Sequence, residues 1–305
     1  MDWLTEPFAV SFVARALLAG LLVASACALA GTWVVLRGMA FLGDAMSHGM
    51  LPGVALASLL GVSLFLGAAA SAAAMALGVA AVTRWSRISQ DTGIGLLFVG
   101  MLSLGVIIVS YSQSFAVDLT GFLFGDVLAA RPRDLLVLAL AAAAAAAVSL
   151  LGHRAFVALA FDPRKARTLG LRPRLAHAAT LGLVTLAIVA SFHVVGTLLV
   201  FGLLIAPPAA MALWARRIPV VMLGAALIGS AATFAGLLVS WHLGTAAGAT
   251  IAAVAVVVFF LSALAARLRD LRPGAAPPPS GPPPEQPPEP AGPRTIPEQE
   301  YECTR

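Results

Sequence analysis

Charged residues are rare in this chain. Only 11% of its 305 residues are Asp, Glu, Lys or Arg, whereas 60% are apolar. Soluble domains are about 25% charged and about 45–50% apolar. A water-soluble protein of this size could not keep so much apolar surface away from water, and disordered or collagen-like chains have other compositions. The composition therefore predicts an all-α, polytopic protein, a bundle of helices that cross a membrane several times.

Cysteine and lysine are rarer still. The two cysteines, Cys27 and Cys303, lie too far apart to suggest a disulfide framework. The only lysine is Lys165, which lies between Arg164 and Ala166. A phosphate-binding loop needs a glycine-rich turn that ends in Lys followed by Ser or Thr, so the chain has no such nucleotide site. The motifs of serine hydrolases and zinc hydrolases are also missing. We therefore expect no enzyme activity, and any ATP must be hydrolysed by another subunit.

The apolar residues predict membrane spans. They fall into nine segments: 12–36, 41–61, 63–83, 92–111, 134–151, 176–192, 196–215, 219–240 and 245–266. A span needs about 20 residues. Segments 134–151 and 176–192 are shorter than that, so an arrangement of eight spans with one re-entrant segment stays open beside nine.

Basic residues indicate the orientation. The loops after even-numbered segments have no Lys or Arg except Arg131 and Arg133. Basic residues follow every odd-numbered segment: Arg37, Arg84 and Arg87, Arg154 to Arg174, Arg216 and Arg217, and Arg267, Arg269 and Arg272. Because basic loops stay in the cytoplasm, we expect these ends and the C-terminus to be cytoplasmic. The net charge of +5 forms no basic stripe with interleaved aromatic residues, so the partner is membrane lipid and not nucleic acid.

The last 33 residues differ from the rest of the chain. Residues 273–305 hold 12 of the 20 prolines and almost no large apolar side chains. Such a segment cannot build a core, because proline removes hydrogen-bond donors and fixes the backbone. The sequence therefore predicts a transmembrane domain over 1–272 and a disordered, proline-rich cytoplasmic tail over 273–305.

Asp44 and His48 are the strongest candidates for a functional site. They are four residues apart, so they share one face of a helix. Ionisable side chains inside an apolar span are costly and usually functional. A carboxylate and an imidazole suit Zn²⁺, Mn²⁺ or Fe²⁺. A structural hydrogen bond, or a position at the cytoplasmic interface, remains the alternative.

The residues around this pair resemble a known signature. Residues 35–48 read VLRGMAFLGDAMSH and residues 51–55 read LPGVA. The similarity continues through DTGIG, AVDL, FLFG, FD, LGL, VGTLLV and IAPPA, which begin at residues 91, 116, 122, 161, 169, 195 and 205. Over about residues 5–268 the chain resembles the zinc/manganese/iron ABC-transporter permeases (the ABC-3 family).

The resemblance implies a function and partners. It implies the permease subunit of an ATP-binding-cassette importer for zinc, manganese or iron in a bacterial cell membrane, which switches between outward- and inward-facing states. A second copy of the chain, ATPase subunits and an extracytoplasmic metal-binding protein would be its partners. The metal is transported and not permanently bound, and Asp44 and His48 are carried over as residues of its pathway.

The loop near 161–174 matches the segment that docks in the ATPase in this family. The residues carried over as coupling residues are Phe161, Asp162, Arg164, Ala166, Leu169, Gly170 and Leu171. Asp162 followed by Pro163 predicts a helix start, and Gly170 predicts its end. A basic loop that touches lipid headgroups is the alternative.

Other polar residues are weaker candidates. Asp118 matches a family position beside the short segment 115–128, and could guide cations at the pore entrance. His193 lies at the break between segments six and seven. His242 stands where the family usually has an acidic residue near its last loop, so the cation-attracting role of that acid is in doubt here.

Two other functions remain open. An ion-coupled secondary transporter could use Asp44 and His48 as a proton or cation relay, although no inverted repeat is visible. A membrane scaffold would leave the cost of these two side chains unexplained. Which metal is carried is not decided by the sequence.

Overall fold

Apolar helices dominate the computed structural model, which describes residues 6–85, 89–111, 125–161 and 173–271. These ranges contain no strand, which agrees with the predicted fold class. Seven helices are long and apolar enough to cross a membrane. They are α2 (Ser11–Leu36), α5 (Leu64–Trp85), α6 (Gln90–Tyr111), α8 (Pro132–Leu151), α11 (Pro173–Ala212), α12 (Ile218–Leu243) and α13 (Ala247–Asp270).

The predicted span 41–61 is built from two short helices. They are α3 (Ala40–Gly49) and α4 (Leu51–Leu60), which meet at Met50. The interruption follows from Pro52, which has no N–H to donate to the carbonyl of His48 four residues earlier. After α4 the chain turns at Gly61, whose φ of 66° is left-handed, and α5 begins three residues later.

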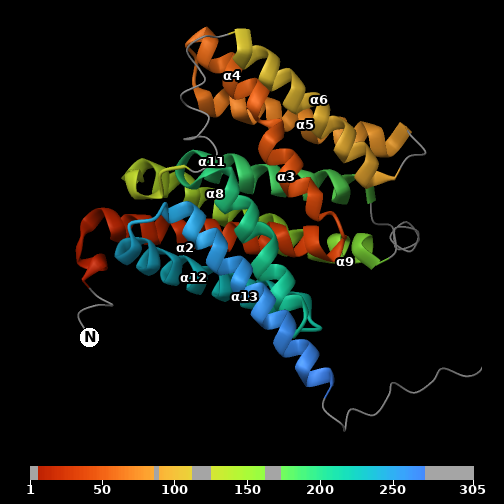
Figure 1. Cartoon of the computed structure of the whole chain (residues 1–305). Coiled ribbons are helices and arrows are strands. Elements are labelled where there is room, and N and C mark those ends of the chain that lie inside the picture. The colour runs from red at the N-terminus through yellow and green to blue at the C-terminus, as the bar shows by residue number, and fades with distance from the viewer. Residues whose placement is uncertain (1–5, 86–88, 112–124, 162–172, 272–305) are drawn as a thin grey trace, which may run out of the picture. The chain divides into compact units, whose positions relative to one another are not determined.

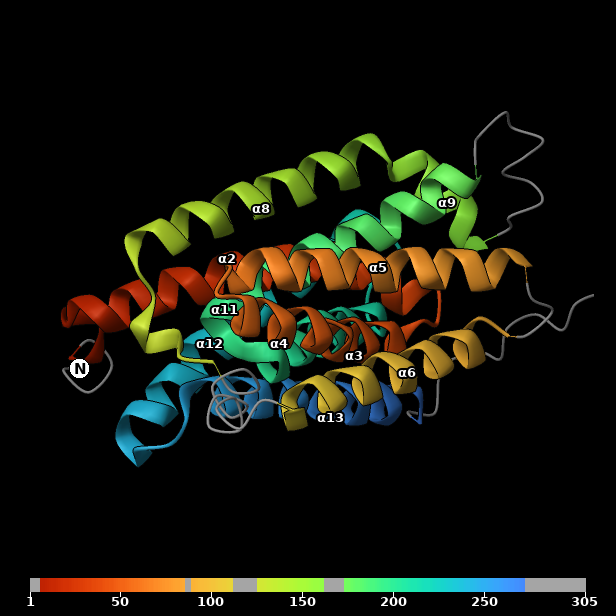
Figure 2. The same cartoon turned by 90° about the horizontal axis from the view of Figure 1, so that it is seen from above.

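The predicted spans 176–192 and 196–215 both lie in α11. Gly196 interrupts this helix with φ 75° and ψ 163°, a conformation that is essentially restricted to glycine. Figures 1 and 2 show that the limbs before and after this turn run in different directions. With α11 counted as two passes and α3–α4 as one, the described residues supply nine passes.

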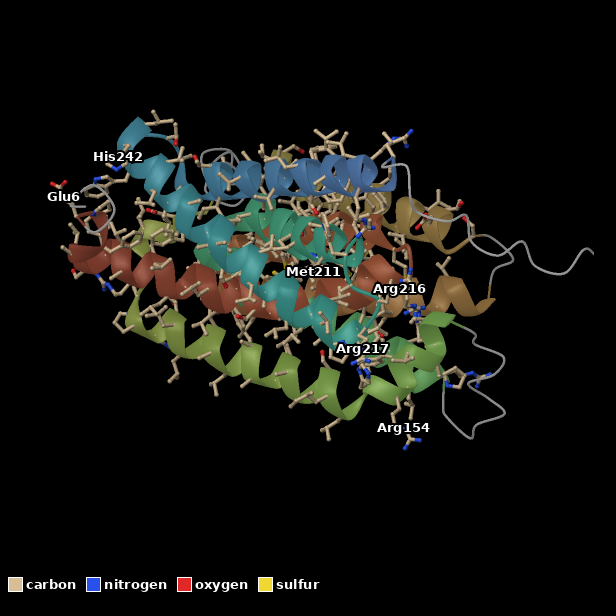
Figure 3. All side chains as sticks on the ribbon, turned by 90° about the horizontal axis from the view of Figure 1, so that it is seen from below. Glu6, Arg154, Met211, Arg216, Arg217 and His242 are labelled. Atoms are coloured by element: carbon tan, nitrogen blue, oxygen red, sulfur yellow. The ribbon has the colours of Figure 1, made fainter. Side chains whose placement is uncertain are left out.

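Most of the basic residues lie at one end of the passes, although Arg131 and Arg133 lie at the start of α8. Figure 3 shows Arg154, Arg216 and Arg217 at one end of the helices, and Glu6 and His242 at the other. The basic ends of the fifth and seventh passes therefore face the same way, as expected from the positions of these arginines in the sequence.

The centre of the bundle is formed by α2 and α11. In α11, 72% of the most apolar stretch is buried, and in α2 50%, more than in any other long helix of the described ranges. The two helices pack directly against each other. They approach closely at Gly31, where a Cβ would collide with the backbone carbonyl of Leu204. Helices α8 and α12 also pack on α2, while α5 and α6 cover α3 and α4.

Three short helices complete the described structure: η1 (Pro7–Ala9), η3 (Val127–Ala129) and α9 (His153–Phe161). Several predictions concern residues outside the described ranges. They are the position of Asp118, the helix predicted between Asp162 and Gly170, and the disordered tail over 273–305.

Candidate metal site

Asp44 and His48 lie one turn apart on α3, within the second pass. The distance between His48 Nε2 and Asp44 Oδ1 is 3.5 Å. The side chain of Asp44 is 32% exposed and that of His48 is 28% exposed, so the pair opens onto an accessible surface. His48 is nine residues into a pass of 21, which places it near the middle of the predicted span 41–61.

The opposite face of α3 packs against the core. A Cβ on Gly43 would lie 2.7 Å from Leu204 Cδ2, so a larger residue here would require the Leu204 side chain to shift. Ser47 is buried, and its hydroxyl donates to the carbonyl of Gly43 (2.9 Å). The small residues of the Gly-Asp-Ala-Met-Ser-His sequence therefore pack α3 against the core. Asp44 and His48 face outward from it.

Helix α6 supports the imidazole. The ring of Phe98 meets the His48 ring edge-on, with centroids 5.7 Å apart and an interplanar angle of 73°. The ring of Phe98 also packs edge-on against the ring of Phe41, one turn before Asp44, with centroids 5.4 Å apart. These contacts restrict the orientation of the His48 side chain. Phe98 was not predicted from the sequence, because it lies 50 residues after His48.

The break between α3 and α4 places backbone groups next to the pair. The carbonyl of His48 cannot accept from residue 52, which is proline, and accepts instead from the N–H of Met50. One residue later, the carbonyl of Gly49 accepts a hydrogen bond from Ser71 Oγ of α5 (2.7 Å). Broken helices of this kind are tolerated in membranes where they are buried in protein or line a cavity.

The spacing of the two side chains suits a shared metal ion. Donors about 2.1 Å from one ion lie about 3.0–3.5 Å apart for octahedral or tetrahedral angles. The observed 3.5 Å is compatible with such a geometry. However, His, Cys, Asp and Glu side chains do not gather in threes anywhere in the described ranges. One chain therefore offers two side-chain ligands at this place, whereas Zn²⁺ takes about four and Ca²⁺ or Mg²⁺ about six or more.

The other candidate residues lie apart from this pair. His193 is exposed on the first limb of α11, three residues before the turn at Gly196. His242 is exposed in the last turn of α12, at the same end as Glu6 (Figure 3). Asp126, which borders the segment of Asp118, caps η3 by accepting from the backbone N–H groups of Leu128 and Ala129 (both 3.2 Å).

The coupling residues are only partly described. Phe161 is the last residue of α9, and Pro173 begins α11. The remaining coupling residues lie between these two and outside the described ranges. Helix α9 (His153–Phe161) itself was not expected, because the sequence predicted a helix in this basic loop only from Asp162 to Gly170.

A polar contact that the sequence did not predict joins α2 to α11. Arg37 Nη2 donates to His177 Nδ1 over 3.1 Å. Arg37 Nη1 and His177 Nε2 are buried and have no hydrogen-bond partner among the described residues. Burial lowers the pKa of the Arg37 guanidinium below its usual value. Because 140 residues separate the two side chains, no local pattern could have indicated this contact.

Fold and site together define a polytopic helical membrane protein with a polar pair inside one pass. The chain belongs to the ABC 3 transport family, whose profile matches residues 9–266. It is 35% identical over 261 residues to the "Manganese transport system membrane protein MntC" of Listeria monocytogenes, with 86% of this chain and 93% of that protein covered. It is 34% identical to the "Probable iron transport system membrane protein" of Haemophilus influenzae, with 88% and 98% covered.

A solved structure has the same fold. It is titled "PsaBC from Streptococcus pneumoniae in complex with Fab", and one of its chains matches with a TM-score of 0.75 and 30% identity. The match covers 86% of this chain and 94% of that chain. The protein is thus a multi-span subunit of a bacterial ABC transporter, and the family predicted from the sequence is confirmed. Family membership also favours the ABC permease over the ion-coupled carrier.

Proposed function

We propose that this chain is the permease subunit of an importer for divalent transition metal ions. The observation that carries this proposal is the Asp44–His48 pair, a carboxylate and an imidazole 3.5 Å apart inside a membrane pass. Both are good ligands for Mn²⁺, Fe²⁺ and Zn²⁺, and both are costly in a membrane without a function. The ion is the substrate, so the pair holds it in transit.

Manganese or iron is the proposed substrate, with zinc as the alternative. The relative from Listeria monocytogenes is named for manganese and the relative from Haemophilus influenzae for iron, and this chain covers 93% and 98% of their lengths. The carboxylate suits these harder ions, and the imidazole suits all three. Cys27 is buried in α2 and does not join Asp44 and His48 in a cluster of ligands.

A second copy of the chain would complete the ligand set. Two side chains are too few to hold an ion of this kind. A twofold axis beside the exposed face of α3 would bring a second Asp44 and His48 to the same ion. We therefore propose a homodimer with the ion pathway between its subunits.

The chain would depend on two further partners. It has no phosphate-binding loop, so separate ATPase subunits would supply the energy. We propose that they dock on the loop near 161–174, which lies between α9 and α11 on the basic and therefore cytoplasmic side. An extracytoplasmic metal-binding protein would deliver the ion to the opposite side.

Uptake of radiolabelled manganese by cells that carry the complete transporter tests the proposal. Asp44→Ala and His48→Ala should each reduce uptake per inserted permease to background. Ser47→Ala is the matched control, because its hydroxyl bonds only within α3. We expect this variant to keep most of its uptake. Wild-type uptake per inserted molecule in both alanine variants, or equal losses in all three, would refute the role of the pair.

A further inference from the structure

An apolar groove runs between α5 and the first limb of α11, on helices other than the one that carries the polar pair. Its volume is about 550 Å³. It is lined from α5 by Phe65, Ala69, Ala73, Ala76, Leu77 and Ala80, and from α11 by Ala178, Leu181, Gly182, Thr185, Leu186 and Val189. The residues recur at helical spacing on both helices, so the groove follows the helices along their length.

The groove offers nothing to a polar ligand. Among its lining residues only Thr185 has a polar side chain, and its Oγ1 donates to the carbonyl of Leu181 within α11 (2.8 Å). At Gly182 a Cβ would meet no atom within 4 Å, so the space there is open. An occupant of this groove must therefore be hydrocarbon.

The dimensions of the groove favour one lipid acyl chain as its occupant over a protein helix. The lining extends over about 22 Å on α5 and about 16 Å on α11, at about 1.5 Å per residue. The groove volume of 550 Å³ is about a third of the roughly 1,600 Å³ that a helix 10 Å across would displace over 20 Å. A helix with its side chains is about 10–12 Å across. A slender acyl chain fits such a groove. The groove is longer than the hydrocarbon thickness of one leaflet, about 15 Å, so it has room for a whole acyl chain.

One end of the groove is positively charged. Arg174 is exposed and lies one turn before Ala178 on α11. The N-terminus of α11 begins one residue earlier, at Pro173, and adds the positive end of a helix dipole. These charges complement a phosphate at the level of the lipid headgroups.

We propose that this groove is a binding site for an anionic phospholipid. One acyl chain occupies the space between α5 and α11, and the phosphate lies at Arg174. The bound lipid lies along both α5, which covers α3 and α4, and the central helix α11. This inference does not depend on the transported ion, because it rests on other helices.

Native mass spectrometry of the purified full-length chain tests the site, with phosphatidylglycerol and phosphatidylcholine of identical acyl chains as probes. Wild-type protein should retain one phosphatidylglycerol per chain. Gly182→Leu places a side chain in the groove and should lose this lipid. Gly100→Leu is the matched control, because Gly100 of α6 also has no atom within 4 Å of its Cβ. It should retain the lipid.

The headgroup is tested separately. Arg174→Gln should reduce the preference for phosphatidylglycerol over phosphatidylcholine about fivefold, which corresponds to about 1 kcal/mol per basic residue. Ala178→Leu provides a second groove-filling variant if Gly182→Leu fails to fold. Equal lipid retention in the groove variants and in Gly100→Leu would refute the site. Loss of a second protein copy from the groove variants, without loss of lipid, would instead show that a protein helix covers this face.

Discussion

At the scale of single residues, two glycines determine where α11 turns. Gly196 has φ 75°, and Gly125 has φ 61°. They come from different parts of the chain, but a Cβ on Gly125 would collide with the backbone at Val195 and Gly196. The two glycines therefore meet, and Gly125, two residues before η3, packs directly on the turn of α11. Both were part of the family signature in the sequence, which gave no sign that they touch.

Replacing Gly196 tests whether the turn of α11 requires glycine. Gly196→Ala forces a Cβ into a backbone conformation that costs about 1–3 kcal/mol for residues other than glycine. We expect a lower thermal midpoint of unfolding in detergent. Gly100→Ala is the control, because alanine in an open, helical position stabilises by about 0.5–1 kcal/mol relative to glycine. A midpoint for Gly196→Ala at or above that of the wild type would contradict the strained turn.

At the scale of secondary-structure elements, the break between α3 and α4 distinguishes the second pass from its neighbours. Gly53 of α4 and Gly67 of α5 are in backbone contact, since a Cβ on either would collide with the carbonyl of the other. The Ser71–Gly49 hydrogen bond lies beside this crossing. The interruption is thus held in place by α5, next to the residues proposed to hold the ion.

The break can be removed by one substitution. Pro52 lies in the first turn of α4, where proline is tolerated, but Pro52→Ala adds an N–H that can donate to the carbonyl of His48 and join α3 to α4 in one helix. We expect an equal or higher thermal midpoint but uptake reduced several-fold, although Asp44 and His48 are unchanged. Pro132→Ala, at the first position of α8, is the control, because a proline there interrupts no hydrogen bond. Unchanged uptake in Pro52→Ala would mean that the break serves only packing.

At the scale of the whole molecule, the nine passes of the described residues predict that the two ends of the chain lie on opposite sides of the membrane. The positions of the arginines predict that the C-terminal end is cytoplasmic. A reporter fused after Asp270 should therefore fluoresce or act only as a cytoplasmic fusion. The same reporter in the loop between α12 and α13, at Thr245, is the control and should behave as exported. An exported reporter after Asp270 would reverse the orientation.

Local patterns in the sequence predicted much of this structure. Hydropathy alone located the passes, because a helix in lipid satisfies its own backbone and must be apolar over about 20 residues. The four-residue spacing of Asp44 and His48 placed both on one face of α3, where the structure has them 3.5 Å apart. The division of 41–61 into two helices also has a local cause, the proline at residue 52, although the sequence indicated only a loosened helix.

Only the tertiary structure decided which helices meet. Phe98 beside His48, Arg37 beside His177 and Gly125 beside Gly196 are contacts between residues far apart in the sequence. The lipid-sized groove likewise joins residues 65–80 to residues 178–189. Helices in a membrane associate through close packing and a few polar contacts, because lipid is as apolar as their side chains. Apolar periodicity therefore cannot specify their neighbours, and the fit of backbones at small residues does.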